Sequence, residues 1–529
     1  MSELEYNLIH RFNVGDVLRR SRARYPSKVA LRYQGRELTY SQLDNLANRT
    51  ARVLLEAGVR RGATVGYLGF NSPEYVAAFF GCPRLGAALV PINVQLTTDE
   101  IDYVLEKTLP QALIIDPALL SRLNLHGEPV SGIPNRFTLG QVPPPEGFHS
   151  MHDALQQVGE AAVEVCVENE DVATIIFTSG TTARPKGVIS NHLNWYSTLI
   201  SAVADLEFSR HQRTLLALPM FHSAGLYLAF ATIATGGIGI IPQNMHGEAI
   251  LEAIVEHKVS RVALPATAWI GLLRVPGIKN LDFSCLERLL VFQYLPTSVF
   301  HCWQELVPNG RWFNYWGQTE TTPLGASTPP EDLARKLTNA DPVGLPHLPL
   351  EVRVVDEAMD ELPPGEAGEL VMRGPSVTPG YLDDPEANEA MFRGGWHHSG
   401  DMGYRDEEGF LYFVDRKKDM IKTGGENVSS LEVEEVLAQD PGVAEVAVLG
   451  LPDPYWIEKV VAVIVPAAGG AVNEEAILAR ARKHLAAFKV PKQIFLVKEL
   501  PKSSTGKIVK RALRRELAAG ASHSLGDPS

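Results

Sequence analysis

The sequence predicts an α/β protein: a large N-terminal body of layered α/β sheets, which includes a β-rich subdomain, and a small α+β C-terminal domain. Short apolar segments alternate with helical stretches through the first part of the chain, as in parallel α/β layers. Between residues 352 and 412 short β-like pieces and turn residues take over, and a charged segment follows. The 529 residues correspond to roughly 3.5 domains of about 150 residues, so several cores are expected.

The first predicted element is an amphipathic helix. Leu43, Ala47, Thr50 and Leu54 fall on one face of it, and Gly58 is placed to end it. Strands are predicted at residues 64–70, 87–92, 112–115, 173–177, 214–218, 239–241 and 261–264.

One apolar stretch raises the question of a membrane span, because no Asp, Glu, Lys or Arg occurs between Leu215 and Gly247. Pro219, His222 and several glycines interrupt this stretch. A strand, a loop, a buried helix and a second strand are therefore expected there, and no membrane span.

The simplest domain boundary lies at the charged segment Arg416-Lys417-Lys418-Asp419. Residues 1–415 are expected to form the N-terminal body, with the β-rich subdomain at about 345–415, and residues 420–529 the C-terminal domain. In the latter, Ser429 and Glu432 predict a capping box at the start of a helix. Its other elements are predicted at residues 445–449, 460–465, 474–487 and 493–497.

Charge and composition exclude some classes of function. The formal net charge of −13 argues against non-specific capture of nucleic acid by a basic face. The 45% hydrophobic and 21% charged residues are typical of a globular protein. The four cysteines form no CxxC pair, so neither a zinc site nor a disulfide framework is expected, and a reducing compartment is favoured. No targeting signal is recognised at either end, so a cytoplasmic location is expected.

The most informative segment follows a predicted strand and reads Thr178-Ser179-Gly180-Thr181-Thr182-Ala183-Arg184-Pro185-Lys186-Gly187. Its hydroxyls, glycine backbone and lysine can all donate hydrogen bonds to phosphate oxygens, so a polyphosphate ligand is expected. A Walker loop is a poor match, because Lys186 stands between Pro185 and Gly187.

Further motifs follow in order. Tyr315-Trp316-Gly317-Gln318-Thr319-Glu320 combines aromatic faces, a glycine that permits close approach and a carboxylate, although as an isolated string it favours a buried aromatic turn. Trp396-His397-His398-Ser399-Gly400-Asp401 ends in a carboxylate that can accept two hydrogen bonds. Pro501-Lys502-Ser503-Ser504-Thr505-Gly506-Lys507 ends in a lysine. In Pro219-Met220-Phe221-His222, a histidine in an apolar run is by itself more often a core residue than a site residue.

With these motifs in this order, the sequence resembles the adenylate-forming superfamily of acyl-CoA synthetases, carrier-domain adenylation enzymes and luciferases, and most nearly the acyl-CoA synthetases. The resemblance runs from about Val14 to Leu517. It implies ATP, Mg²⁺ and coenzyme A as cofactors. Contacts with these cofactors are implied for Thr178, Ser179, Gly180, Thr181, Thr182, Lys186, Trp316, Gly317, Thr319, Asp401, Arg416, Gly424 and Gly425.

The resemblance also implies individual roles. Glu320 would bind the metal, and Lys507 would bridge the substrate carboxylate and the α-phosphate, so that Lys507, His222 and Glu320 form the catalytic set. Residues 416–419 would be a hinge in which Lys418 is the pivot of a mobile C-terminal domain. Lys502 and Lys510 are expected to be surface charges.

The expected acyl pocket includes Phe221, Gln293, Tyr294 and Leu295. His222 stands where members that activate amino acids usually carry aspartate, which favours a plain carboxylic acid. Two departures from the family pattern are visible: Ala183 replaces a usual glycine, and Gln293 and Tyr294 replace a usual pair of glycines.

The resemblance implies a two-step ligase that forms an acyl-adenylate and then an acyl-CoA thioester. The substrate segments contain no charged residue, so a hydrophobic monocarboxylic acid is expected, with aryl, cyclic or compact acids favoured over long fatty acids. Two alternatives stay open: an adenylation enzyme that loads a carrier protein, and a non-catalytic nucleotide-binding relative. The expected partners are small molecules, with a carrier protein as the alternative acceptor and no nucleic acid. The chain is expected to be a monomer or a homodimer.

Overall fold

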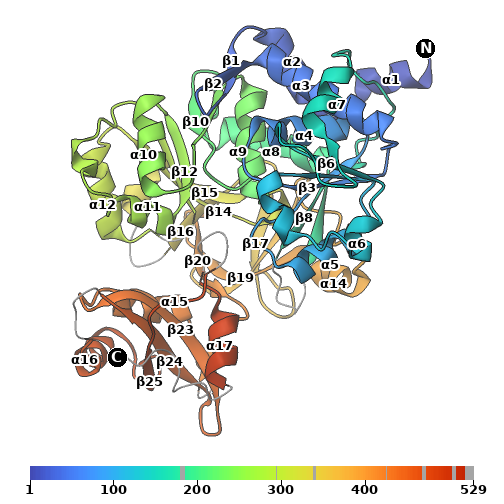
Figure 1. Ribbon diagram of the computed structural model, residues 1–529. Helices are drawn as coiled ribbons and strands as arrows, with labels where there is room; N and C mark the ends of the chain where they lie inside the picture. The colour runs from blue at the N-terminus through green and yellow to red at the C-terminus, as the bar shows by residue number, and fades with distance from the viewer. Residues whose placement is uncertain are drawn as a thin grey trace. The chain divides into compact units, whose positions relative to one another are not determined.

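The computed structural model describes residues 1–178, 185–292, 295–336, 341–423, 426–467, 472–502 and 508–518 (Figure 1). The chain forms two compact units. Unit 1 comprises residues 1–338, 343–352 and 372–397, and unit 2 comprises residues 339–342, 353–371 and 398–529. The expected hinge at 416–419 stays a prediction, because compactness does not report on motion.

The first sheet of unit 1 has seven strands in the order β7-β6-β5-β3-β4-β8-β9. All neighbours are parallel except β8 and β9, which form an antiparallel pair. The predicted α/β layer is thereby confirmed. The bounds are β3 Thr64–Leu68, β4 Ala88–Pro91, β5 Ala112–Ile115, β6 Asn135–Thr138, β7 His149–Ser150, β8 Val172–Thr178 and β9 Lys186–Asn191.

The second sheet of unit 1 runs in the order β15-β14-β13-β12-β10-β11-β1-β2, and β16 Asp341–Pro346 pairs with β15. Strands β10, β12, β13 and β14 are parallel, so their carboxyl ends meet at one edge, where ligands bind in open α/β sheets. The bounds are β1 Val29–Tyr33, β2 Arg36–Thr39, β10 Arg213–Leu215, β11 Ile238–Ile241, β12 Arg261–Pro265, β13 Arg288–Phe292, β14 Arg311–Gly317 and β15 Gly325–Thr328.

Helices bury their apolar faces against these sheets. Figure 1 shows α10, α11 and α12 grouped beside β12, where Trp269 and Trp303 are fully buried. The helices of unit 1 are α1 Glu3–His10, α2 Val14–Arg24, α3 Tyr40–Glu56, α4 Pro73–Arg84, α5 Thr98–Thr108, α6 Glu128–Ser131, α7 Met151–Gln157, α8 His192–Ala204, α9 Ser223–Thr235, α10 Gly247–Glu256, α11 Ala266–Leu272, α12 Thr297–Leu306, α13 Pro330–Lys336 and α14 Pro385–Met391. Short 3-10 turns lie at η1 Pro117–Arg122, η2 Ile278–Asn280, η3 Thr319–Thr321 and η4 Arg393–Gly395.

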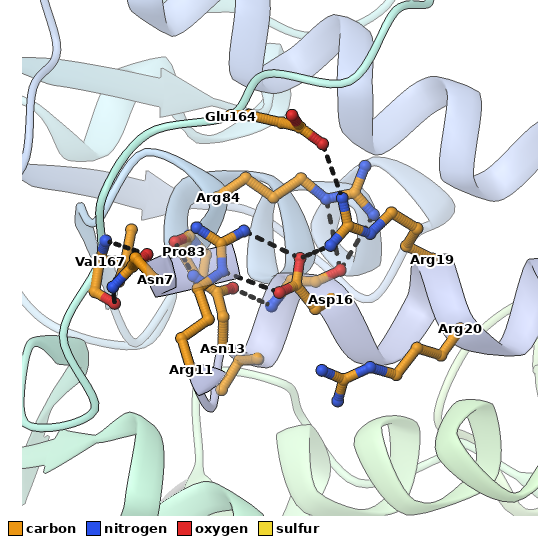
Figure 2. A network of polar contacts seen from close by, with 12 residues as sticks. Asn7, Arg11, Asn13, Asp16, Arg19, Arg20, Pro83, Arg84, Glu164 and Val167 are labelled. Carbon is orange, nitrogen blue, oxygen red and sulfur yellow. Dashed lines mark hydrogen bonds and ion pairs between the residues drawn. The ribbon is translucent and has the colours of Figure 1, made fainter. Parts of the chain in front are cut away.

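A buried polar network joins the N-terminal helices to α4 (Figure 2). Arg11 and Arg19 both pair with the buried Asp16, at 2.9 and 3.0 Å. Arg84 at the end of α4 pairs with the buried Asp44 of α3 at 2.5 Å and donates to the carbonyl of Gly15 in α2. Because each buried charge has a partner of opposite sign, the network can be accommodated in the interior.

The β-rich part of unit 2 has strands in the order β17-β18-β19-β20. The predicted change to short strands after residue 351 is confirmed. The bounds are β17 Glu351–Val355, β18 Gly368–Arg373, β19 His397–Arg405 and β20 Leu411–Arg416.

The C-terminal part of unit 2 is a sheet in the order β22-β21-β24-β23, with β25 beside β24. Alternate residues of β23 and β24 face opposite sides, so both faces are buried. Val446, Val448 and Ala462 pack with α15 and α16, whereas Ala447, Leu449 and Val461 pack with α17. The bounds are β21 Ile421–Thr423, β22 Glu426–Val428, α15 Ser430–Ala438, β23 Val443–Asp453, β24 Ile457–Pro466, α16 Glu474–His484, β25 Gln493–Leu496 and α17 Lys510–Ala518.

Two local predictions are wrong. Ser429 caps α15, but Glu432 does not complete the capping box, because its carboxylate pairs with Lys489 at 2.7 Å. Lys510 is not a surface charge: its side chain is only 11% exposed, and its ammonium lies 2.7 Å from Glu434. Lys502 is exposed, as predicted, and pairs with Glu445.

The uncharged stretch after Leu215 forms a loop, helix α9 and strand β11, as predicted. None of the helices in the described ranges combines the length and apolar character that a membrane span requires.

Candidate active site

The β8–β9 hairpin positions the two ends of the predicted phosphate loop. Thr178 ends β8 and faces Lys186, the first residue of β9, across the antiparallel pair. The segment at Tyr381 lies antiparallel to β9, since Tyr381 bridges Val188 and the Leu382 amide donates to the Gly187 carbonyl. These strand contacts place the Lys186 ammonium 4.9 Å from the centre of the Tyr381 ring.

The Lys186 ammonium also lies 3.7 Å from the Asp384 carboxylate at the start of α14. The Tyr381 hydroxyl donates a hydrogen bond of 3.0 Å to Oε1 of Glu320. One tyrosine therefore links the lysine of the phosphate loop to the carboxylate expected to bind Mg²⁺. Burial and then the Glu320 charge raise the pKa of Tyr381, so its hydroxyl stays protonated and donates.

Strand β14 carries Trp316 and Gly317 to the carboxyl edge of the second sheet. An added Cβ at Gly317 would lie 1.9 Å from the carbonyl oxygen of Pro323, so only glycine lets the following turn fold back on the strand. Thr319 and Glu320 lie in that turn, η3. The Thr319 hydroxyl lies 3.1 Å from the hydroxyl of Ser223, which joins η3 to the start of α9.

The Phe221-His222 pair lies at the N-terminus of α9. The two rings are 4.6 Å apart, Phe221 is buried, and His222 occupies the N-cap position. Leu295, the described member of the predicted turn after β13, is buried in the core around α10 to α12. Phe221, His222, Thr319 and Glu320 are thus brought together by the Ser223–Thr319 contact, whereas Leu295 belongs to an apolar core.

In unit 2, neighbouring strands bring Asp401 and Arg416 together. The two residues are register partners of β19 and β20, and their ion pair measures 2.8 Å. Asp401 is 1% exposed, so Arg416 supplies the charge that its buried carboxylate needs. Lys418 follows two residues after Arg416, and burial lowers its pKa, although the neighbouring Asp419 opposes that shift.

The two histidines before Ser399 have protein partners. A ring nitrogen of His397 lies 3.2 Å from the Gln318 side chain within unit 1. His398 lies 3.1 Å from Glu369 within unit 2, and Lys417 lies 2.8 Å from the same carboxylate. These contacts support structural roles for both imidazoles.

Several predicted site residues lie outside the described residues, and their expected roles stay predictions. They are Ser179, Gly180, Thr181, Thr182, Gln293, Tyr294, Gly424, Gly425 and Lys507.

Sequence reasoning missed Tyr381 and Tyr315. Tyr381 carries no signal in the sequence, because its contact with Glu320 joins residues 61 positions apart. Tyr315 could have been found from the sequence, because alternation along β14 places its side chain on the same face as Gly317 and opposite Trp316. Its hydroxyl donates to the Pro323 carbonyl at 2.6 Å.

The comparisons with known proteins agree with this geometry. The family model for AMP-binding enzymes matches residues 18–382, and the model for the C-terminal domain of AMP-binding enzymes matches residues 432–507. The chain belongs to the AMP-binding, adenylate-forming enzyme family. The resemblance and the predicted fold class are therefore confirmed.

Named relatives narrow the class. The chain is 34% identical to a feruloyl-CoA synthase of Amycolatopsis over 491 residues, which cover 93% of this chain and 96% of that protein. It is 32% identical to an indoleacetate–CoA ligase of Aromatoleum aromaticum over 502 residues, with the same coverage. Within its family, the chain is an AMP-forming acid–CoA ligase.

Solved structures support the same class. The anthranilate CoA ligase in complex with anthranoyl-AMP has a TM-score of 0.88 and 29% identity, and the match covers 97% of this chain and 98% of that one. The ATP-bound MatB from Rhodopseudomonas palustris has a TM-score of 0.86 and 28% identity, and the match covers 96% of this chain and 99% of that one.

Proposed function

We propose that this ligase activates a hydrophobic aryl or otherwise compact monocarboxylic acid with Mg·ATP and transfers the acyl group to coenzyme A. The observation that carries the proposal is the character of the segments expected around the acyl group. Residues 221–227 and 321–325 contain no charged side chain, and Phe221 and Tyr227 are buried. A second charge or an ammonium on the substrate would be costly to bury there. The named relatives act on ferulate and indoleacetate, which are aryl acids.

The first half-reaction joins a carboxylate oxygen of the acid to the α-phosphorus of ATP and releases pyrophosphate. Both reactants are anionic, so catalysis depends on positioning and on cations. Lys186 and the residues of the phosphate loop hold the phosphates. Lys507 bridges the acid and the α-phosphate, and His222 borders the acyl group.

Glu320 fits the expected metal role. Mg²⁺ in nucleotide sites typically takes one or two carboxylates together with phosphate oxygens, and Tyr381 orients the Glu320 carboxylate through Oε1. When bound, the ion neutralises charge on the phosphates. Asp401 accepts hydrogen bonds from the ribose and Arg416 reaches the nucleotide, while Trp316 packs on adenine.

In the second half-reaction, the thiol of coenzyme A attacks the acyl carbon, the bond to AMP breaks, and the thioester forms. Gly424 and Gly425 line the path of the pantetheine arm in this proposal. The named relatives are CoA ligases, which favours coenzyme A over a carrier protein as the acceptor.

Pyrophosphate release over a panel of acids tests the proposal. We expect a higher kcat/KM for aromatic and alicyclic acids than for fatty acids of 12 to 16 carbons, a chain-length range chosen to exceed a compact pocket, by at least about tenfold. Preference for the long chains would defeat the assignment of substrate class. Absence of pyrophosphate release with every acid would favour the non-catalytic alternative.

The acceptor is tested separately, by supplying coenzyme A or a carrier protein after adenylate formation. Thioester formation with coenzyme A alone is expected. Transfer to the carrier protein alone would establish the other alternative.

A further inference from the structure

Two buried side chains near the acyl segments have polar atoms without partners. The Tyr227 hydroxyl and both ring nitrogens of His347 have no hydrogen-bond partner among the residues that the structure describes. The two residues are only 3% and 1% exposed. Such atoms are rare in folded proteins, because a buried polar atom that stays unpaired lowers stability. A bound group that pairs with them would remove this cost.

Both residues are anchored to the expected acyl segments. Tyr227 lies in α9, whose N-cap is His222. The backbone amide of His347 donates a hydrogen bond of 3.0 Å to the carbonyl of Gly325, at the end of the segment that follows Glu320. The two residues therefore belong to, or are hydrogen-bonded to, segments expected around the acyl group.

Tyr315 packs beside His347. Its ring centre is 5.4 Å from that of His347 and 5.3 Å from that of Phe292, its register partner on β13. Its own hydroxyl already donates to Pro323. Tyr315 thus contributes a fixed aromatic wall, and the free hydrogen-bonding capacity belongs to Tyr227 and His347.

Both unpaired side chains are neutral near pH 7. Burial lowers the pKa of His347 to about 4, against the opposing charge of Asp205. Asp205 is held by the Ser201 hydroxyl at 2.6 Å and by the Leu348 amide at 3.1 Å. Burial also raises the pKa of the Tyr227 hydroxyl. A neutral imidazole and a neutral phenol pair best with an uncharged group that both donates and accepts.

We infer that Tyr227 and His347 bind an uncharged hydrogen-bonding substituent on the acid, such as a ring hydroxyl or amino group remote from the carboxylate, against the wall formed by Tyr315. The inference rests on the proposed function, because it places the acid beside α9 and the segment after Glu320. It makes the acid polar at its far end, whereas the proposed function requires only a hydrophobic body.

Matched pairs of acids test this inference in ATP–pyrophosphate exchange. The pairs are cinnamic with 4-hydroxycinnamic acid, and benzoic with 3-hydroxybenzoic and 4-aminobenzoic acid. In at least one pair, we expect the wild-type kcat/KM to favour the substituted acid by about 10- to 100-fold, because the unsubstituted acid leaves the buried atoms unpaired.

Variants then locate the preference. The ratio of kcat/KM for the substituted acid to kcat/KM for the unsubstituted acid is expected to fall to within about threefold of unity in Tyr227→Phe and in His347→Leu. The KM for ATP should not change. His347→Gln, which keeps a donor and an acceptor, should restore part of the ratio. Tyr75→Phe is the matched control, since the Tyr75 hydroxyl is equally buried and unpaired but lies on none of the acyl segments. Direct binding of each acid by calorimetry provides a readout that does not depend on turnover.

The outcomes separate the two proposals. Equal use of both acids in every pair, or a preference that survives both Tyr227→Phe and His347→Leu, would overturn the inference and would mean that ordered water satisfies these atoms. The proposed function would still stand in that case, because the aryl acids would be activated. If no aryl acid of either kind released pyrophosphate, the proposed substrate class itself would fail.

Discussion

Tyr381 is the residue that most directly connects the phosphate loop with the expected metal carboxylate. Its ring lies under the Lys186 ammonium, and its hydroxyl donates to Glu320. A hydrogen bond to a charged group contributes about 1.5–3 kcal/mol, which corresponds to at least about tenfold in an equilibrium constant. Orientation of Glu320 should therefore depend on a single hydroxyl group.

Tyr381→Phe is predicted to raise the half-saturating Mg²⁺ concentration by about tenfold in ATP–pyrophosphate exchange, because Glu320 loses its donor. The KM for the acid should not change. Tyr381→Leu also removes the ring beneath Lys186, so the KM for ATP should rise as well. Tyr404→Phe is the control, since Tyr404 stacks on Tyr412 in unit 2. An unchanged Mg²⁺ requirement in Tyr381→Phe would show that Glu320 is oriented by other groups.

Lys507→Ala is predicted to lower the rate of adenylation by about 10²–10³ while use of a supplied acyl-adenylate is largely retained, because the proposed bridge acts only in the first half-reaction. Both half-reactions can be followed separately with pyrophosphate exchange and with thioester formation. Lys502→Ala provides a nearby control, since Lys502 is exposed and pairs with Glu445. Equal loss in both half-reactions would contradict this division.

Helices α2, α3 and α4 are joined by polar contacts as well as by apolar packing. The Arg84 guanidinium reaches Asp44 of α3 and the Gly15 carbonyl of α2, and it also contacts Asn48. Both partners of the Arg84–Asp44 ion pair are almost fully buried, at 3% and 1% exposure of their side chains. Removal of one partner would leave an uncompensated charge inside the protein.

Arg84→Met is predicted to lower the free energy of unfolding by about 3–5 kcal/mol, and the measurement is urea denaturation. Arg373→Met should cost less than about 1 kcal/mol, because the Arg373–Glu351 pair is about half exposed on both sides. Arg84→Met combined with Asp44→Leu should recover part of the loss, since it removes the isolated charge. Similar small losses in both single variants would show that the Arg84 network contributes little.

The expected pivot Lys418 lies within unit 2, between β20 and β21. In the proposed cycle, the backbone at Lys418 adopts one state for adenylation and another for thioester formation. Proline restricts φ to about −65°, so Lys418→Pro would permit only one state. We expect ATP–pyrophosphate exchange to survive and acyl-CoA synthesis to fall by about 10²-fold, as when reacting groups are misplaced. Lys418→Ala keeps the freedom of the backbone, so its acyl-CoA synthesis should fall much less. Unchanged acyl-CoA synthesis in Lys418→Pro would contradict the hinge assignment.

Stability of unit 1 should fall in mild acid. His192 and His347 are both buried, and burial lowers the pKa of each to about 4 from about 6.5 in the unfolded chain. The unfolded state therefore binds more protons between these values, so stability is fully present above about pH 6.5 and is lost as the pH falls toward 4. Each histidine should lower the free energy of unfolding by roughly 2 kcal/mol between about pH 7 and pH 5. Urea denaturation should show this loss reduced in His192→Gln and His347→Gln; identical pH profiles would contradict it.

Local patterns in the chain were sufficient for much of the architecture. Helical spacing predicted α3, and apolar runs predicted β3, β5 and β12, because these elements bury one face or both and the periodicity records that burial. The motifs at Lys186 and Glu320 were also visible, since each is contiguous. In contrast, the capping box at Ser429 failed because Glu432 pairs with Lys489, which lies 57 residues away.

By itself, the sequence determined the α/β class, the order of the motifs and the family to which the chain belongs. Only the tertiary structure revealed that Tyr381 joins Lys186 to Glu320, that Lys510 pairs with Glu434 in a largely covered position, and that Tyr315 and His347 pack together. The reason is physical. Periodicity and contiguous motifs reflect contacts between near neighbours in the chain, whereas side-chain partners in a folded core are set by sheet order and by the crossing of distant segments.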